Sequence, residues 1–450
     1  MNTVKRKILF VIFIIAFFII SPIVIFYASG YKLDWKNPLS FYFIQKTGML
    51  IIASDPAEAE IFLNEKKQKN FSPDLKIFKG GETIKTPAKI KNLLPGSYDL
   101  RVERPGYWPW ERRIKIFSEQ ITHVLDVRLF RHSLPTLSIL TNDTEIKVSP
   151  NDKKMILLPS GDIFEIKNEA VSKTSSSSQA SATWSPDSGK IIFPEEIANL
   201  KSPEKNISLK KILGEDFSLA KWGKSNEEII YLHNNKLSRL NLATQAAQVL
   251  LIEEKILDFL PGKNQIAALS TAGTAVKLKI FSPDKETAGK EISLPFSENY
   301  LFINEEGKFL NILDKSHSLL YLIDPATGQI KETLKNCKYA AWFNDDTLFY
   351  ANDFEIWALN LTQNTKRLLT RVSENPITSI LATKTDNYLL YFTNKTINIL
   401  TWDKGEEKIQ PTELLRLEKI SSPIFAADSG IIYFLSQIDN QQGLYKLAIR

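Results

Sequence analysis

The sequence predicts an all-β protein with one apolar helix at its N-terminus. Three observations lead to this fold class: residues 8–28 carry no charge, residues 48–131 form short strands bounded by turn residues, and residues 132–450 repeat one pattern about every 40 residues. The 57 Lys and Arg residues nearly balance the 51 Asp and Glu residues, so the charge does not indicate nucleic-acid binding. We therefore expect a membrane helix, a small β-sandwich and a β-propeller, with no nucleic-acid partner.

The first predicted element is a membrane-spanning helix over residues 8–28, ILFVIFIIAFFIISPIVIFYA. About 20 apolar residues, at about 1.5 Å each, match the thickness of a bilayer's hydrocarbon. A cleaved signal peptide is the alternative, because Ala28-Ser29-Gly30 resembles a cleavage site. The apolar part of a signal peptide is usually only about 7 to 15 residues long, however. We therefore expect an uncleaved anchor that crosses the cell membrane once.

Basic residues on one side of the span predict its orientation. Lys5, Arg6 and Lys7 come immediately before the apolar residues, and few charges follow directly after them. Positively charged flanks are retained on the cytoplasmic side of a membrane. We therefore expect residues 1–7 to be a cytoplasmic tail and the chain after Ser29 to be extracytoplasmic.

Residues 29–47 are expected to form a tether between the span and the first domain. They lack a clear hydrophobic period. Their aromatic residues could lie at headgroup level or at the edge of the next domain: Trp35, Phe41, Tyr42 and Phe43.

Residues 48–131 are expected to form the β-sandwich. The predicted strands are rich in β-branched and aromatic residues: 48–53, 59–64, 88–93, 97–104, 112–117 and 120–130. Turn formers such as Asp55-Pro56 and Pro95-Gly96 separate these strands. Residues 65–86 are rich in lysine and predict an extended loop or an exposed hairpin. No helical period longer than about two turns occurs, which favours a small all-β domain.

Two stretches of this region, SDPAEAEIFLN at 54–64 and TPAKIKNLLPGSYDLRVERPGYWPW at 86–110, resemble the PEGA domain. The shared features are a proline-initiated strand, a Thr-Pro pair, a Leu-Pro-Gly turn into a Tyr-x-Leu-x-Val strand, and a Gly-Tyr pair. Ala57-Glu58-Ala59 and Asn64-Glu65 depart from the family's Glu-Gly-Ala and Asp-Gly. The resemblance implies a β-sandwich module of bacterial and archaeal surface proteins, with an adhesion, glycan-contact or spacer role and no catalysis.

The aromatic run after the fourth strand contains one candidate binding residue. Tyr107 and Trp110 are expected to pack inward, because Trp110 has the same strand parity as Ile114. Trp108 lies between Pro105 and Pro109, which fix the turn that carries it. It is therefore the candidate surface aromatic for stacking on a sugar ring or for insertion at a membrane surface. A single exposed aromatic residue is also common without any function.

The remaining chain, residues 132–450, repeats a strand that ends in a large apolar residue, a polar turn and a second strand. The eight strand ends lie at Val148, Trp184, Trp222, Phe259, Phe302, Trp342, Ile380 and Phe425. Their spacing is that of a four-stranded propeller blade. Residues 134–141 could supply the fourth strand that the last unit lacks, which would close a ring of eight blades. Seven blades are the alternative, if the unit around Ile380 or Phe425 is misread.

One turn of this region, WSPDSGKIIF at 184–193, resembles those of TolB-like or WD-like propeller repeats, which specifies architecture only. Trp184, Trp222 and Trp342 recur at equivalent places in three repeats. Such recurrence indicates one packing need that is met once per blade, so these tryptophans are expected to be structural.

Motifs for catalysis or metal binding are absent from the sequence. The single cysteine, Cys337, excludes an intramolecular disulfide and a cysteine metal cluster. None of the histidines, His123, His132, His233 and His317, has the spacing of a zinc site. No nucleophile elbow, P-loop or dinucleotide fingerprint occurs. We expect no cofactor and no metal.

Two function classes follow. The first is a noncatalytic, membrane-anchored scaffold of the cell envelope, whose propeller binds envelope proteins or cell-wall glycans. The alternative is a propeller-based carbohydrate-active enzyme, a lyase or glycosidase with acidic and histidine residues gathered in its channel. We favour the first and expect that the protein is not an enzyme, because a propeller fold alone indicates no particular activity.

Overall fold

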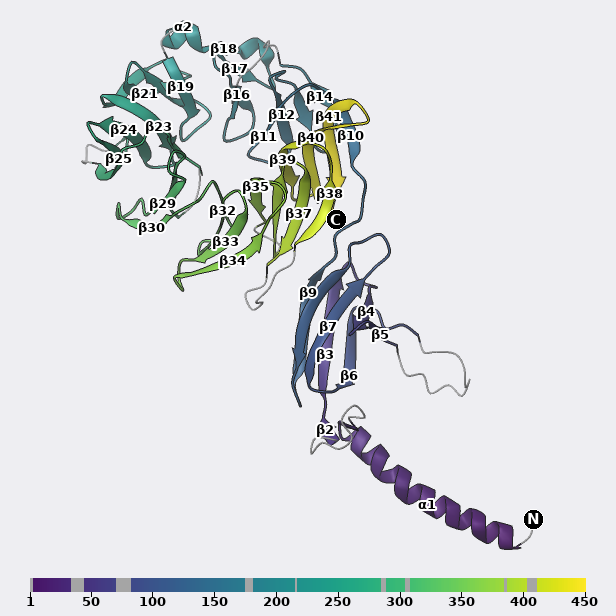
Figure 1. Ribbon diagram of the computed structural model, residues 1–450. Helices are drawn as coiled ribbons and strands as arrows, with labels where there is room; N and C mark the ends of the chain where they lie inside the picture. Colours follow the sequence, from purple (N-terminus) through teal and green to yellow (C-terminus); the bar gives the residue numbers. More distant parts are fainter. Residues whose placement is uncertain are drawn as a thin grey trace. The chain divides into compact units, whose positions relative to one another are not determined.

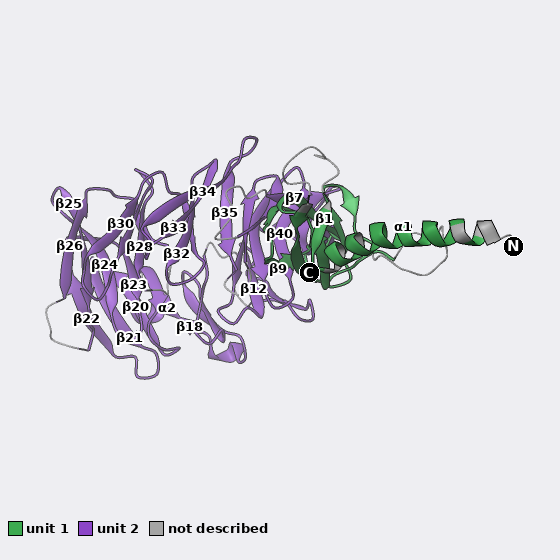
Figure 2. Ribbon diagram, turned by 90° about the horizontal axis from the view of Figure 1, so that it is seen from below, with its two compact units in different colours: residues 1–133, 449–450 green, residues 134–448 purple. Residues whose placement is uncertain are grey.

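The computed structural model describes residues 3–33, 44–69, 82–174, 181–214, 217–284, 289–303, 308–383, 387–402 and 411–450. The chain divides into two compact units (Figure 2). Unit 1 comprises Met1–Ser133 and Ile449–Arg450, and unit 2 comprises Leu134–Ala448. The boundary falls after Ser133, where the sequence predicts it after residue 131. The last two residues belong to unit 1, where the Arg131 N–H donates to the carbonyl of Ile449 at 3.0 Å.

Unit 1 begins with the apolar helix α1 (Thr3–Ala28) and a two-stranded antiparallel ribbon of β1 (Tyr31–Leu33) and β2 (Ile44–Lys46). The predicted tether is therefore partly a paired ribbon, in which Tyr31 lies opposite Lys46. Residues 34–43, with the four aromatic residues predicted near the membrane exit, lie outside the described residues.

The sandwich of unit 1 consists of two sheets (Figure 1). One sheet has the order β6-β3-β9, from Ala88–Leu93, Gly48–Asp55 and Ile121–Arg128, and β3 and β9 run parallel. The other has the order β5-β4-β7-β8, from Lys66–Lys67, Glu60–Leu63, Gly96–Glu103 and Trp110–Ile116. The alternating residues predicted to point inward form one core, and Leu100 and Val102 are 1% and 0% exposed. The small all-β sandwich is confirmed.

The Thr-Pro pair of the PEGA-like motif joins the two sheets. Thr86 is buried, and its hydroxyl accepts the Ala59 N–H at 3.1 Å and lies 2.5 Å from the hydroxyl of Ser54. These bonds satisfy polar groups that would otherwise be buried without partners. A small hydroxyl residue at this position therefore connects β3 with the start of β4.

Unit 2 carries eight four-stranded antiparallel sheets in its described residues. In chain order, the first four sheets are β11–β14 (Glu145–Val148, Lys154–Leu158, Ile163–Glu165, Val171–Ser172), β15–β18 (Thr183–Trp184, Lys190–Ile192, Glu196–Asn199, Ile207–Ser208), β19–β22 (Phe217–Trp222, Glu228–His233, Lys236–Asn241, Ala247–Ile252) and β23–β26 (Lys255–Pro261, Ile266–Ala272, Ala275–Phe281, Lys290–Pro295). The 3-10 helix Pro203–Lys205 and helix α2 (Leu209–Leu213) flank β18.

The next three sheets are β27–β30 (Tyr300–Phe302, Leu310–Asp314, Leu319–Ile323, Ile330–Leu334), β31–β34 (Tyr339–Trp342, Thr347–Ala351, Glu355–Asn360, Thr365–Arg371) and β35–β38 (Ile377–Ala382, Tyr388–Thr393, Thr396–Thr401, Thr412–Arg416). The eighth sheet combines β10 (Thr136–Leu140) with β41 (Gln441–Ala448), β40 (Ile431–Ile438) and β39 (Ile420–Ala426). Eight sheets thus stand where the sequence predicts eight blades, with seven as the alternative.

The sheets follow one another around a ring, in which β35 lies toward the centre and β38 toward the outside of their sheet (Figure 1). Strands β23 and β27, and likewise β31 and β35, contact each other between neighbouring sheets. The eighth sheet closes this ring, because β10 enters from the N-terminal side and pairs with β41 from the C-terminal end. Gly443 permits that pairing: a Cβ atom there would lie 2.3 Å from the carbonyl oxygen of Ile139. The predicted closure by residues 134–141 is present as β10.

Neighbouring sheets share their apolar cores. Phe259 of β23 is fully buried and packs against the β20–β21 pair of the preceding sheet. Tyr433 and Phe164 join the last sheet to the first, with ring centroids 5.7 Å apart. A single four-stranded sheet has two faces to cover, and in a ring each face is covered by the next sheet. The all-β propeller fold predicted from the repeats is confirmed, with one apolar helix at the N-terminus.

Candidate functional site

The four histidines lie on separate elements. In the part of the chain that the structure describes, no group of three or more His, Cys, Asp or Glu residues could hold a metal ion. His123 is exposed on β9, His132 contacts Trp108, His233 ends β20 and His317 follows β28.

One serine, one aspartate and one histidine come together in the sheet β27–β30. The Ser297 hydroxyl donates to Asp314 Oδ1 at 2.8 Å, and His317 Nδ1 lies 2.7 Å from Asp314 Oδ2. In a hydrolase triad the histidine stands between the other two groups and takes the serine proton. Here the carboxylate occupies the middle, and Ser297 and Asp314 are 4% and 1% exposed. The trio therefore holds the turn after β28 in place.

The repeat tryptophans join consecutive sheets, and two of them do so with a hydrogen bond. The indole N–H of Trp184 donates to the carbonyl of Lys147 at 3.1 Å, and that of Trp222 donates to the carbonyl of Thr183 at 3.0 Å. In both cases the acceptor is on the first strand of the preceding sheet. Trp184 and Trp222 are 8% and 6% exposed, so these bonds are shielded from water.

Trp342 lies at the equivalent place but makes a different contact. Its ring stacks on Phe309 with centroids 5.9 Å apart and an interplanar angle of 19°. Its indole N–H is buried and has no hydrogen-bond partner among the described residues. The three tryptophans thus occupy equivalent positions and all pack between sheets, but only Trp184 and Trp222 form the hydrogen bond to the preceding sheet.

Trp108, the candidate surface aromatic, is half-buried at the end of the sandwich where β7 passes into β8. Its ring meets His132 edge to face, with centroids 4.4 Å apart, and its backbone N–H donates to the Phe130 carbonyl at 2.8 Å. Trp110 lies in the core at 7% exposure, and Tyr107 packs against it. A role of Trp108 in binding stays a prediction.

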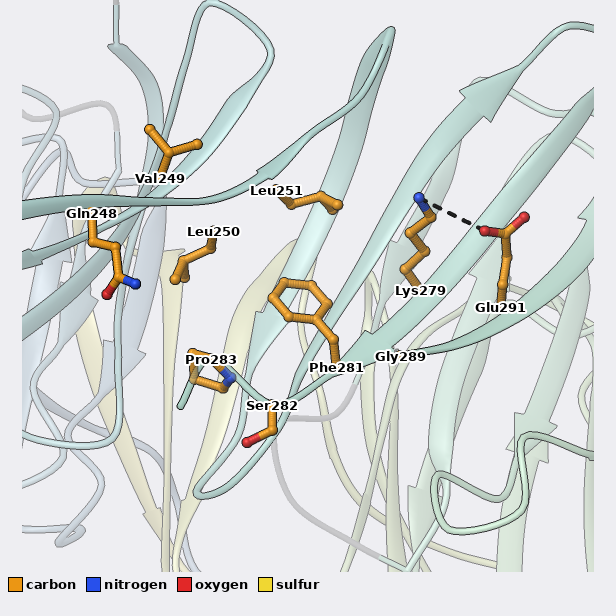
Figure 3. Close-up of a pocket in the computed structure, with 10 residues that line it drawn as sticks. All are labelled: Gln248, Val249, Leu250, Leu251, Lys279, Phe281, Ser282, Pro283, Gly289 and Glu291. Atoms are coloured by element: carbon orange, nitrogen blue, oxygen red, sulfur yellow. Dashed lines mark ion pairs between the residues drawn. The ribbon is translucent and has the colours of Figure 1, made fainter. Parts of the chain in front are cut away.

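A groove that the sequence did not indicate lies between the sheets β19–β22 and β23–β26 (Figure 3). Its volume is about 450 Å³. Apolar side chains of β22 and β25 line it, with Val249 52% exposed and Phe281 opposite. Its charged groups are already paired, because Lys279 lies 3.7 Å from Glu291 and also contacts Glu253. These groups therefore select no charged ligand by themselves.

A charge cluster holds the loop beside this groove. Asp284 accepts hydrogen bonds from Lys224 at 2.8 Å and from Arg239 at 2.5 Å, which hold the pKa of its carboxyl at about 2, below the ordinary 3.8. Arg239 also donates to Gln248 of β22 at 2.7 Å. Asp284, three residues after β25, is thereby tied to the neighbouring sheet.

Helix α1 presents an apolar surface on all sides. Among the described residues it is the one helix long and apolar enough to cross a membrane, over Ile8–Phe26, and none of that window is buried. Arg6, one of the three predicted topology residues, is exposed, and the side chains of Lys5 and Lys7 lie outside the described residues.

Comparison with known proteins bears on both units. The PEGA domain family matches residues 77–130. No curated protein matches the chain. The PEGA resemblance of the sandwich is thus supported over a region that includes the Thr-Pro pair, the Leu-Pro-Gly turn and the aromatic run.

Solved structures resemble the chain in fold. A crystal structure of the eukaryotic initiation factor matches with a TM-score of 0.51 and 13% identity, covering 68% of this chain and 90% of that chain. The β-propeller domain of Cps50 (Swd1) from Myceliophteria thermophila matches with a TM-score of 0.41 and 12% identity, covering 58% and 97%. Oligogalacturonate lyase in complex with manganese matches with a TM-score of 0.42 and 10% identity, covering 70% and 93%. At such identity the likeness concerns the fold alone.

Proposed function

We propose that the protein is a noncatalytic scaffold of the cell envelope, anchored by α1 and binding a protein or glycan partner through its extracytoplasmic propeller. The observation that carries this proposal is the surface of α1. Phe13 and Phe18 are each 71% exposed, in a window of 19 residues without a buried position. Such a surface is strongly unfavourable in water and favourable in the hydrocarbon of a bilayer.

The orientation follows from charge. Lys5, Arg6 and Lys7 precede the span, which favours a cytoplasmic N-terminus and an external sandwich and propeller. The PEGA family match supports this placement through the surface proteins in which such domains occur. The match implies adhesion or spacing, and the propeller then supplies the larger binding surface.

Extraction of native membranes tests the anchor. The full chain should stay in the pellet at alkaline pH and dissolve in detergent. A variant with Phe13→Arg and Phe17→Arg should move to the supernatant, because each arginine at the centre of a span costs about 3 kcal/mol. Release of the unaltered chain by alkali would contradict the anchor.

Photo-crosslinking in native envelopes tests the binding role. A photoreactive residue is placed at Val249 in the groove, or at Ile330 on the outer strand of another sheet, which are 52% and 42% exposed. The matched control is Leu278, which is fully buried in the sheet β23–β26. An adduct with one envelope component at either exposed position, and none at Leu278, is expected. Absence of an adduct at both exposed positions would count against binding by the outer strands.

A further inference from the structure

The two ends of the sandwich differ in what they expose. One end is formed by the turns 93–97 and 116–121 together with the start of β3, and it contacts the β1–β2 ribbon; we call it the ribbon end. The opposite end carries Trp108, and we call it the far end. The β7–β8 ladder separates them, running from Gly96 opposite Ile116 to Val102 opposite Trp110. Seven strand residues span about 23 Å.

The ribbon end is bound closely to the last residues of the helix segment. The backbone N–H and the hydroxyl of Thr47 both donate to the carbonyl of Gly30 at 2.8 Å, two residues after α1. The Glu119 N–H in turn donates to the Thr47 carbonyl at 3.0 Å, and Lys46 pairs with Glu119 at 2.5 Å. Hydrogen bonds from Gly30 through Thr47 to Glu119 therefore connect the exit of α1 with the turn 116–121.

Gly48 allows this close approach. A Cβ atom at Gly48 would lie 2.3 Å from the carbonyl oxygen of Phe117, which is far inside a normal contact. The backbone of the turn can therefore lie directly against the start of β3. Phe117 is thus held near the exit of α1 by backbone packing.

The ribbon end exposes apolar side chains next to lysines. Phe117 and Ile121 are 45% and 52% exposed. The ammonium group of Lys115 lies 5.1 Å from the ring centroid of Phe117, and Lys115 has no carboxylate partner among the described residues. Lys91 on β6 is also exposed. Apolar side chains beside unpaired lysines are typical of surfaces that rest in the interface of a bilayer.

We propose that the ribbon end rests on the bilayer leaflet from which α1 emerges, with Phe117 and Ile121 at headgroup level and Lys115 facing lipid phosphates. This inference rests on the proposed anchoring by α1. It places the exposed apolar surface where the hydrogen bonds of Thr47 to the Gly30 carbonyl already hold it, so no separate encounter with the membrane is required. It also assigns Trp108 at the far end to a face turned away from that membrane.

Depth-dependent quenching in proteoliposomes tests the proposal with the full chain. Cys337 is fully buried, and burial raises the pKa of its thiol to about 12, so a cysteine added at the surface is the one that reacts with a maleimide dye. The dye is placed at Ile121→Cys or at Leu125→Cys. Leu125 is 59% exposed on the same face of β9 but about 13 Å further along the strand.

Lipids with a spin label at the headgroup should quench the dye at Ile121 at least about twice as strongly as at Leu125, because quenching falls steeply over this distance. The ratio should fall when Lys115→Glu is added in vesicles that contain phosphatidylglycerol. Equal and weak quenching at both positions would overturn the proposal. A dye at Phe13→Cys separates this failure from failure of the anchor: lipids labelled in the acyl chain quench it if α1 spans the bilayer and leave it bright if α1 does not.

Discussion

The sandwich and the propeller solve the same burial problem in different ways. The sandwich packs two sheets of different strand order against each other, so its inward residues, such as Leu100 and Ile61, belong to one core. The propeller repeats one sheet, and every core lies between two neighbours, as Phe259 does. A sandwich is complete by itself, whereas a propeller sheet is stable only when its neighbours and the closing strand are present. A destabilising substitution should therefore affect only the sandwich when it lies in unit 1, and should affect all the propeller sheets when it lies in unit 2.

The largest expected effect comes from removing a shared core residue. Phe259→Ala should destabilise the propeller by about 3 to 5 kcal/mol, because a fully buried ring is lost and a cavity remains. Calorimetry should show one lowered transition for the whole propeller and an unchanged transition for the sandwich. Leu100→Ala is the matched variant in the sandwich and should lower only the other transition. Two separate propeller transitions in the Phe259→Ala variant would show that the sheets do not depend on one another.

The closure of the ring gives the next effect. Gly443→Ala places a Cβ atom against the Ile139 carbonyl and should cost about 2 to 3 kcal/mol through the displaced β10–β41 pairing. Gly273→Ala is the control, since its turn leaves open space and only the positive φ of 59° is strained, at about 1 kcal/mol. Chemical denaturation measures both. Equal losses would mean that the closing pair contributes little to the ring.

A smaller effect distinguishes the equivalent tryptophans. Trp222→Phe removes the hydrogen bond to Thr183, whereas Trp342→Phe removes an N–H without a partner among the described residues. The loss at Trp222 should exceed the loss at Trp342 by about 1 kcal/mol. The difference between the two free energies of unfolding checks this. A greater loss at Trp342 would contradict the structural distinction between the sheets.

The smallest effect concerns pH. Asp284 is bound by Lys224 and Arg239, so its pKa falls from 3.8 to about 2 on folding. A lowered pKa in the folded state stabilises the protein above the unfolded pKa, and this stabilisation is lost as the pH falls from about 4 to about 2. Because Asp284 is exposed, Asp284→Asn should lower the propeller Tm by only about 1 °C at pH 7 and by much less near pH 2. An equal loss at pH 7 and pH 2 would exclude an ionic cause.

Much of the fold could be predicted from the sequence because its signals are local. The strand 88–93 matches β6 residue for residue, since Thr-Pro and Pro-Gly turns mark both ends. The repeat period predicted the ring of sheets, but the pairing register between the first two strands of each sheet was less evident. Trp222 pairs with the residue seven positions later, Ile229. In the next sheet Leu260 has this spacing to its partner, whereas the repeat pattern marks Phe259. Two adjacent apolar residues at that strand end made either one a possible equivalent of Trp222.

The candidate sites were less predictable because they depend on contacts between distant segments. The prolines on both sides singled out Trp108, but no motif indicated that the ring of His132 would meet it edge to face. The groove beside Val249 arises where β22 of one repeat meets β25 and β26 of the next, and no motif marks it. Phe117 and Ile121 follow an ordinary strand end, and only the hydrogen bonds between Gly30, Thr47 and Glu119 relate them to α1.

Labelling of intact cells tests the central claim, an anchored chain with an external propeller, most directly. Gln363→Cys adds a thiol to the exposed turn between β33 and β34, and the unaltered chain with its buried Cys337 is the control. A membrane-impermeant maleimide should label Gln363→Cys in intact cells to the same extent as after lysis, and should leave the control unlabelled. Labelling of Gln363→Cys only after lysis would place the propeller in the cytoplasm and contradict the account.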